Sequence, residues 1–466
     1  MPNLLAYLAL ALWPVVTALL FRRLSPARAM ILALVGGYLL LPEPPAAFDL
    51  PLFPPLTKHN IPALSALVAL VWTQGAGASL LPRNGLARVL LAIFVLSPVV
   101  TVLANPEPLV FTGNYVPGLG LKDAVALPLQ QALLILPFLL ARRLLATGPA
   151  QRELLLALFH GGLVYSVLML IEIRLSPQLN LWIYGYFQHS FEQTIRFGGF
   201  RPTVFLYHGI WVAFFCMSAL VAAWALWKSD REGNRITYFV GGLYLAAVLV
   251  LAKSLGAIVL AVGLVPLVLL LGPVMQINAA ILIACLALSY PLMKGVGAVP
   301  EDAILERAAA VSPDRANSVG FRFDQENQLL DRAQRKPLFG WGSWGRNHVH
   351  DEVTGRIETV ADGRWIITIG IYGWIGFLAE FGLISLPLFL LWRETVSRRN
   401  GEVTPFIAPL GLLLAFNLFD MLPNATLTPI TWMIAGALTG YAEALRSERL
   451  QEPKQPRSRL GWKPIL

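Results

Sequence analysis

The side chains best suited to chemistry in this chain are two arginines, Arg201 and Arg322, and the carboxylate of Asp362. A guanidinium group binds phosphate oxygens through two parallel hydrogen bonds and keeps its charge, so two arginines could hold a diphosphate. A carboxylate or histidine beside them could take a proton from an acceptor hydroxyl. No Asp-x-Asp motif accompanies these arginines, which argues against a metal ion on the diphosphate.

Arg201 belongs to a polar segment, 182–208, that is rich in aromatic residues and also contains Arg196, His189 and His208. Aromatic rings beside arginines could stack on sugar faces, which makes Arg196 and His208 candidate substrate-binding residues. The simpler interpretation is that tryptophan and tyrosine here anchor the membrane interface, and that arginines next to a span extend toward lipid headgroups.

Arg322 and Asp362 lie in a second polar segment, 294–364. The stretch 322–336 predicts an amphipathic helix that ends before Pro337. The apolar residues on one face of this helix are Phe323, Leu330 and Ala333.

Further candidates follow in the same segment. Trp341 and Trp344 are candidate sugar-binding residues, although their glycine-rich run could equally be a structural turn. Arg364, two residues after Asp362, is a further candidate for substrate binding. His348 and His350 are alternatives to Asp362 as catalytic base, since Asp362 could instead cap a helix.

The composition requires that a membrane surround these residues. Of the 466 residues, 56 % are hydrophobic and 14 % are charged, whereas a soluble domain carries about 25 % charged residues. About 20 apolar residues cross a bilayer. Thirteen apolar runs predict spans at roughly 3–21, 29–42, 62–81, 87–104, 127–145, 153–173, 207–227, 237–252, 254–272, 276–293, 365–391, 405–422 and 425–445. We expect an all-α polytopic membrane protein with about 12–13 transmembrane helices and one large periplasmic loop; twelve or fourteen spans are possible.

The basic residues predict the orientation of these spans. Twenty of the 36 Lys and Arg residues lie on alternate connections and in the C-terminal tail, six lie on the short opposite connections, and ten lie within 294–364. Because short cytoplasmic loops are enriched in Lys and Arg, the first group is expected in the cytoplasm. The net charge of +9 is therefore a topology signal, and no nucleic-acid partner is expected.

Four parts of the chain follow from this topology. Residues 1–293 form the first ten spans, 294–364 the periplasmic loop, 365–445 the last spans, and 446–466 a basic cytoplasmic tail. Cys216 and Cys285 lie within apolar runs, so both are expected to be core residues and not a disulfide or metal pair.

Four short motifs give the chain a family resemblance. They are Phe200-Arg-Pro-Thr-Val-Phe-Leu-Tyr-His-Gly209, Lys253-Ser-Leu-Gly-Ala257, Ser318-Val-Gly-Phe-Arg322 with Lys336-Pro-Leu-Phe-Gly-Trp-Gly342, and Asp362 followed by glycines at 373 and 376. In order and membrane placement these motifs resemble those of the O-antigen ligase and O-antigen polymerase superfamily of bacterial surface-polysaccharide enzymes. That family has about twelve spans and a large periplasmic loop late in the chain.

The resemblance implies a glycosyltransferase of the bacterial inner membrane whose active site faces the periplasm. It implies that Arg201 and Arg322 engage an undecaprenyl diphosphate donor without a metal or cofactor, and that a loop histidine acts as base. Here Asp362 stands in the position of that histidine, and Gly363 replaces the asparagine that follows it. This departure favours a polymerase of exopolysaccharide or O-antigen repeats over a standard lipopolysaccharide ligase.

The partners that the resemblance implies are a polyprenyl-diphosphate-linked oligosaccharide, a glycan or lipid A-core acceptor, membrane lipids and other polysaccharide-assembly proteins. The competing class is a lipid-linked glycan transporter or flippase without covalent chemistry. Such a protein would carry charged residues through its spans. Glu380 and Asp420 could mark a proton or ion path, or could simply pair with an Arg or Lys. Together with Lys253 they are too few and too peripheral to favour a transporter. An enzyme requires instead that Arg201, Arg322 and Asp362 meet at one outward site.

Overall fold

The computed structural model describes residues 1–75, 79–196, 198–397 and 403–451. Within these residues the chain is almost entirely helical, with two short antiparallel hairpins, β1 (Leu109–Val110) with β2 (Tyr115–Val116) and β3 (Ile195–Arg196) with β4 (Gly199–Phe200). Six basic residues that the topology argument used lie outside the described residues; they are Arg398, Arg399, Lys454, Arg457, Arg459 and Lys463.

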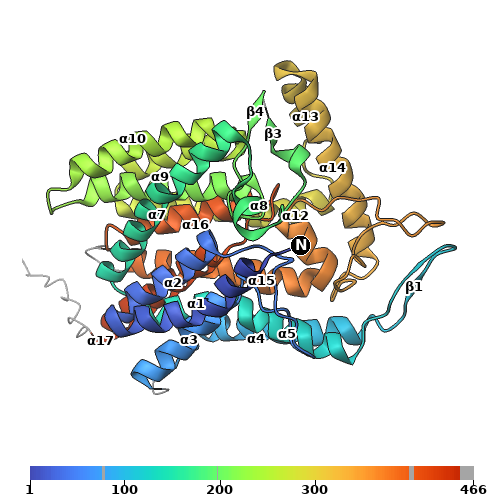
Figure 1. Ribbon diagram of the computed structural model, residues 1–466, viewed down its shortest axis with the longest axis horizontal. Helices are drawn as coiled ribbons and strands as arrows, with labels where there is room; N and C mark the ends of the chain where they lie inside the picture. The colour runs from blue at the N-terminus through green and yellow to red at the C-terminus, as the bar shows by residue number, and fades with distance from the viewer. Residues whose placement is uncertain (76–78, 197, 398–402, 452–466) are drawn as a thin grey trace, which may run out of the picture.

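The helices follow one another along the whole chain (Figure 1). They are α1 (Leu4–Arg23), α2 (Pro26–Leu40), α3 (Ile61–Gln74), α4 (Gly85–Leu103), α5 (Leu121–Leu134), α6 (Leu136–Leu144), α7 (Gly148–Leu175), α8 (Leu179–Tyr184), α9 (Gly209–Ser229), α10 (Arg235–Leu251), α11 (Leu255–Leu270), α12 (Pro273–Gly295), α13 (Glu301–Val311), α14 (Pro313–Gln334), α15 (Arg364–Ser397), α16 (Ile407–Asp420) and α17 (Pro429–Gln451), with a 3₁₀ turn, η1 (Phe191–Thr194).

The helices confirm an all-α protein with apolar helices suited to a membrane. In the described parts of the chain, seven helical segments are long and apolar enough to cross a bilayer, and five shorter apolar helices accompany them. Each of the thirteen predicted runs overlaps one of the helices, except that 127–145 is divided between α5 and α6. The run 62–81 is longer than α3, and its residues 76–78 lie outside the described residues. The division between α5 and α6 falls at Ile135, two residues before Pro137, whose ring nitrogen cannot donate the hydrogen bond of a continuous helix.

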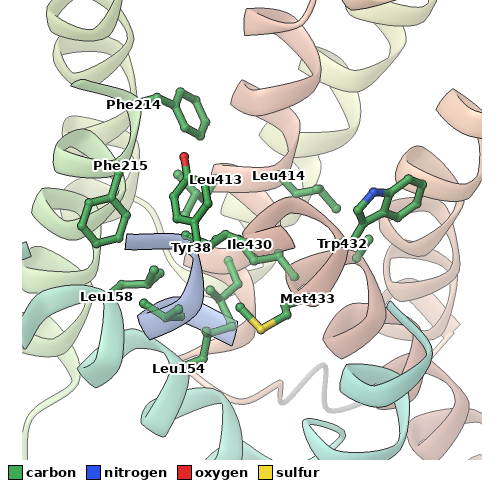
Figure 2. Packing of buried hydrophobic residues seen from close by; sticks show 14 of the residues in the cluster. Tyr38, Leu154, Leu158, Phe214, Phe215, Leu413, Leu414, Ile430, Trp432 and Met433 are labelled. Carbon is green, nitrogen blue, oxygen red and sulfur yellow. The ribbon is translucent and has the colours of Figure 1, made fainter. Parts of the chain in front are cut away.

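Buried aliphatic and aromatic side chains of α2, α7, α9, α16 and α17 form the centre of the helix bundle (Figure 2). The ring of Tyr38 packs edge-on against Phe215 at 6.4 Å between centroids. Trp432 is fully buried between Phe94 and Phe138. Since lipid tails are as apolar as these side chains, close packing and not water exclusion holds such helices together.

Two glycines allow α17 to approach α6 closely. A Cβ atom at Gly436 would lie 2.3 Å from the carbonyl oxygen of Phe138, and one at Gly440 would lie 2.1 Å from that of Arg142. The four-residue spacing of the glycines places both on one face of α17, as in the small-residue interfaces common between membrane helices. These two close approaches hold α17 against α6.

The connections between helices separate into two groups, at opposite ends of the bundle. At one end, Arg142 of α6 pairs with Glu443 of α17 at 2.7 Å, and the side chain of Arg83 donates a hydrogen bond to that of Ser447. At the other end, Arg346 donates to the carbonyl oxygens of Pro117 and Glu107, at 2.8 and 2.9 Å. These two arginine-containing connections thus lie at the opposite end of the bundle from Arg346.

Helix α14 confirms the predicted amphipathic helix. Leu330 and Ala333 are buried, whereas Arg322 projects toward solvent with 42 % of its side chain exposed. The helix ends at Gln334, three residues before Pro337. The predicted loop therefore contains ordered helices, α13 and α14, which lean away from the bundle in Figure 1.

A turn at residues 336–342 docks into a break in α15. The break is at Gly373, where φ is +69° and a Cβ atom would lie 2.2 Å from the carbonyl oxygen of Leu338. Four backbone hydrogen bonds join the turn to the helix, from Trp341 to Gly370, Gly342 to Ile371, Trp374 to Pro337 and Ile375 to Leu338, at 2.8–3.2 Å. The turn thereby satisfies peptide groups that the break leaves without helical partners.

Candidate functional site

The backbone that carries Arg201 is held by a buried carboxylate at the end of α7. Glu172 accepts hydrogen bonds from the backbone N–H groups of Thr203 and Val204, at 2.8 and 2.7 Å, and from that of Leu179 at 3.0 Å. Only 1 % of Glu172 is exposed. These backbone N–H groups satisfy the buried carboxylate of Glu172 and fix the segment that carries Arg201.

Side chains from the connection between α2 and α3, and from α7, hold the same segment from the other side. Lys58 donates to the carbonyl oxygen of Phe205 at 2.6 Å and pairs with Glu43 at 3.1 Å. The hydroxyl of Tyr165 accepts the N–H of Phe205. Burial alone would raise the pKa of Glu43, but its ion pairs with Lys58 and His59 lower that pKa to about 2. The 201–206 backbone is thus fixed by contacts on several elements.

The side chain of Arg201 lies across the start of α9. A Cβ atom at position 209 would meet Cδ of Arg201 at 2.2 Å, so a larger residue there would displace the Arg201 side chain. One guanidinium nitrogen donates to the carbonyl oxygen of Lys253 at 3.4 Å, while the buried Nε has no hydrogen-bond partner among the described residues. Burial and the nearby charges of Arg196 and Arg322 lower the pKa of Arg201 to about 10. The site therefore holds cations close together.

Arg322 brings Asp362 to this cluster. Its Nε lies 3.8 Å from a carboxylate oxygen of Asp362, and about half of each side chain is exposed. Helix α15 begins at Arg364, so Gly363 occupies the position just before it. Among the described residues Asp362 accepts no backbone hydrogen bond from this helix, so its observed partner is Arg322. The three residues predicted to meet, Arg201, Arg322 and Asp362, lie in one neighbourhood.

Two histidines border the arginines. The rings of His189 and His208 lie 5.0 Å apart in an edge-on arrangement. Burial and then the charges of Arg201, His189 and Arg196 lower the pKa of His208 to about 3, so this ring is neutral at physiological pH. Its Nδ1 accepts the N–H of Ile210 at 3.1 Å, which leaves Nε2 to donate to Gln193 at 3.2 Å.

The acidic residues near the spans have local partners. Arg364 forms two 2.6 Å hydrogen bonds with Glu380, one to each carboxylate oxygen, and does not pair with Asp362. Asp420 accepts hydrogen bonds from Thr426 and Asn424. Glu380 therefore pairs with an arginine, whereas Asp420 is hydrogen-bonded to a hydroxyl and an amide.

The remaining candidates lie in the irregular part of the loop. Cationic groups stand close to the Trp341 ring, that of Arg332 at 3.5 Å and that of Lys336 at 4.9 Å from the ring centre, so the ring packs within the loop. Trp344 is 67 % exposed and donates to Asp123 at 3.0 Å.

The two loop histidines are ordered by this region. His348 contacts Thr359 through Nδ1 at 3.0 Å, and the His350 ring lies 5.2 Å from that of Phe111. Burial lowers the pKa of both histidines, and for His350 the charge of Arg332 adds to this effect. Arg332 is thus the cation that lowers the pKa of His350, whereas Arg201 and Arg322 are the cations grouped with Asp362.

A cavity of about 640 Å³ opens beside the start of α15. Its walls come from the connection between α2 and α3, from α5, α9 and α15, and from the 335–363 segment, and include Gln131, Trp211 and Tyr372. The Arg364 charge is matched by Glu380, and the lining also contains the carboxylate of Asp49 beside its aromatic rings and amides. Asp362 is two residues from Arg364, which lines the cavity. Because two peptide units span at most about 7 Å, the backbone of Asp362 lies close to the cavity wall.

Sequence reasoning missed several residues that build this site. Glu43, Lys58 and Glu172 received no role, although charged residues at the ends of spans are costly and therefore signal a specific partner. In the described parts of the chain, no group of three or more His, Cys, Asp or Glu side chains is placed to hold a metal ion.

Comparison with known proteins adds no family. No protein-family model matches the chain, and no curated protein matches it. The resemblance therefore rests on the short motifs alone.

Proposed function

We propose that the protein transfers a glycan from a polyprenyl diphosphate donor to a sugar hydroxyl at the periplasmic face of the bacterial inner membrane. The observation that carries this proposal is the meeting of Arg201, from the connection before α9, with Arg322 and Asp362, from the 294–364 segment. Arg201 and Arg322, more than 100 positions apart in the sequence, form one cationic group, and in the described part of the chain Asp362 forms an ion pair with Arg322.

The diphosphate is assigned to Arg201 and Arg322. Like charges held together repel, and a bound dianion would relieve that repulsion while accepting bidentate hydrogen bonds. The unpartnered Nε of Arg201 adds a donor for this purpose. Because diphosphate leaves readily, charge stabilisation by arginine contributes more to the barrier than protonation of the leaving group.

Asp362 is assigned the role of base. A diphosphate that binds Arg322 competes with Asp362 for the guanidinium group, so donor binding frees the carboxylate. The acceptor oxygen then bonds to the anomeric carbon as the bond to the diphosphate oxygen breaks and its electron pair passes to the diphosphate. The hydroxyl proton passes to Asp362, and attack opposite the leaving group inverts the anomeric centre.

The 640 Å³ cavity is assigned to the acceptor glycan. Its volume is in the range of small-molecule sites. Trp211, Tyr372 and Gln131 on its walls suit an uncharged, hydroxyl-rich ligand, whereas the arginine cluster suits an anion. This division favours a polymerase of surface-polysaccharide repeats, in which a second glycan is the acceptor.

The test is transfer by the purified protein, with a polyprenyl-diphosphate oligosaccharide from the source cells and the matching acceptor. Arg322→Lys keeps the charge but loses the planar fork, and one hydrogen bond to a charged group contributes roughly 1.5–3 kcal/mol. We expect transfer to fall about ten- to a hundredfold. Arg356→Lys is the matched control, since this exposed arginine lies on the same loop outside the cluster.

Full transfer by an Arg201→Ala, Arg322→Ala double variant would contradict the diphosphate assignment. Movement of intact lipid-linked glycan across a vesicle membrane, with no new glycosidic bond, would replace the transferase by the flippase alternative.

A further inference from the structure

A second basic pocket lies at the opposite end of the bundle from the candidate site. It has a volume of about 490 Å³ and is formed where α4 begins and where α6 and α17 end. Four arginines line it, Arg83, Arg88, Arg142 and Arg143, against one carboxylate, Glu443. The lining therefore carries a net charge of three.

The carboxylate in this pocket is already fully used. One oxygen of Glu443 accepts two hydrogen bonds from Arg142, at 2.7 and 2.9 Å, and the other accepts the backbone N–H groups of Arg83 and Asn84. Arg142 also donates to the carbonyl oxygen of Leu80 at 3.0 Å. Arg142 and Glu443 thus form a neutral, rigid floor that fixes the connection leading to α4.

The arginines above this floor project an excess of positive charge. The side chain of Arg83 donates to the hydroxyl of Ser447 at 3.2 Å, and that of Arg88 donates to the carbonyl oxygen of Pro82 at 2.5 Å. Both are exposed, and neither has a carboxylate within ion-pair distance in the described parts of the chain. Each guanidinium group retains donors for a ligand.

The positive surface continues into an adjoining pocket of about 230 Å³ that shares Arg83 and Glu443. This pocket adds Arg393, Arg446 and Glu394, and the Glu394 carboxylate pairs with Arg393 at 3.0 Å and with Arg449 at 2.7 Å. Again the acidic group is neutralised within the protein, so no carboxylate opposes an anion at either pocket.

Apolar side chains border the charged surface. Leu81 lines the first pocket and is 51 % exposed, and Leu450 lines the second and is 69 % exposed. On α4, Leu86 and Val89 are each more than half exposed. A ligand that carries phosphate next to hydrocarbon would satisfy both parts of this surface.

We propose that these two pockets form a binding site for the headgroup of an anionic phospholipid, with its phosphate on Arg83 and Arg88 and its acyl chains along α4. Arginine binds phosphate oxygens bidentately, and basic pockets between membrane helices are suited to acidic headgroups. The two joined pockets suit cardiolipin, which carries two phosphates. The site is independent of the glycan-transfer proposal.

The test is native mass spectrometry of the full-length protein in detergent, titrated with cardiolipin and separately with phosphatidylethanolamine. We expect cardiolipin to bind at least tenfold more tightly. An Arg83→Gln, Arg88→Gln double variant should bind cardiolipin about 25-fold more weakly, since each basic residue near an acidic headgroup is worth roughly a fivefold change. Arg28→Gln is the control, because Arg28 is exposed at the same end but pairs with Glu153 outside both pockets.

Equal binding of the two lipids by the unmodified protein would overturn the proposal without reference to any variant. So would unchanged cardiolipin binding by the double variant. Displacement of cardiolipin by millimolar inorganic phosphate would likewise overturn it and identify a soluble anion as the ligand. Thermal unfolding of the double variant at the wild-type temperature would show that weaker binding is not a folding defect.

Discussion

Replacing Glu172 by glutamine should destabilise the protein and disturb the position of Arg201. The carboxylate accepts three backbone hydrogen bonds, two at one oxygen and one at the other. Glutamine has only one carbonyl oxygen, so at least one N–H group loses its partner and faces an NH₂ donor instead. A hydrogen bond to a charged group contributes roughly 1.5–3 kcal/mol and a buried unsatisfied group costs about 1–3 kcal/mol. We expect a loss of about 3–5 kcal/mol.

Glu153→Gln is the matched control, because Glu153 lies on the same helix and pairs at 3.5 Å with Arg28 on the protein surface. Exposed pairs of this kind contribute about 0.2–1 kcal/mol. The assay is thermal unfolding in detergent, combined with limited proteolysis within 185–208. Equal unfolding temperatures and equal cleavage rates for the two variants would refute the assignment of Glu172 as the residue that holds this segment.

Three further predictions concern Gly373 at the break in α15, the proposed base Asp362, and Glu43 in the connection between α2 and α3. Gly373→Ala must adopt a positive φ, which costs about 1–2 kcal/mol, and must also displace the docked turn, so it should unfold at a lower temperature than Gly256→Ala, whose added Cβ meets nothing. Asp362→Asn should abolish transfer without loss of folded protein; retained transfer would move the base to another residue. Glu43 has a native pKa of about 2, below its ordinary 4.5, so its contribution of about 3 kcal/mol is complete above pH 4.5 and is lost as the pH falls toward 2. Acid unfolding should therefore be less steep in Glu43→Gln, and an unchanged profile would show that the pair with Lys58 contributes little.

The apolar runs predicted the helices well because a long apolar segment must pair its own backbone N–H and C=O groups, which a helix does. The amphipathic spacing after Arg322 was sufficient for α14. The break at Gly373 could not be predicted in this way, because a glycine inside an apolar run is compatible with a continuous helix and only the distant turn shows why it is needed.

Pairings between distant residues were the harder part of the site. Arg364 was predicted only as a candidate for substrate binding, and its partner, Glu380, is 16 residues away on the far side of the break in α15. The backbone partners of Glu172 lie in a connection some 30 residues later. Such contacts depend on how helices pack, which local sequence spacing does not specify.

The turn docked into α15 also bears on how the protein is made. Unpaired peptide groups cannot face lipid, so α15 reaches its final form only with residues 336–342 already in place at the break. Those residues leave the ribosome before the helix does. Completion of α15 then waits on the placement of a turn that precedes it in the chain. An exchange of the 294–364 segment alone between two such proteins would succeed only if the incoming turn fitted the recipient's helix.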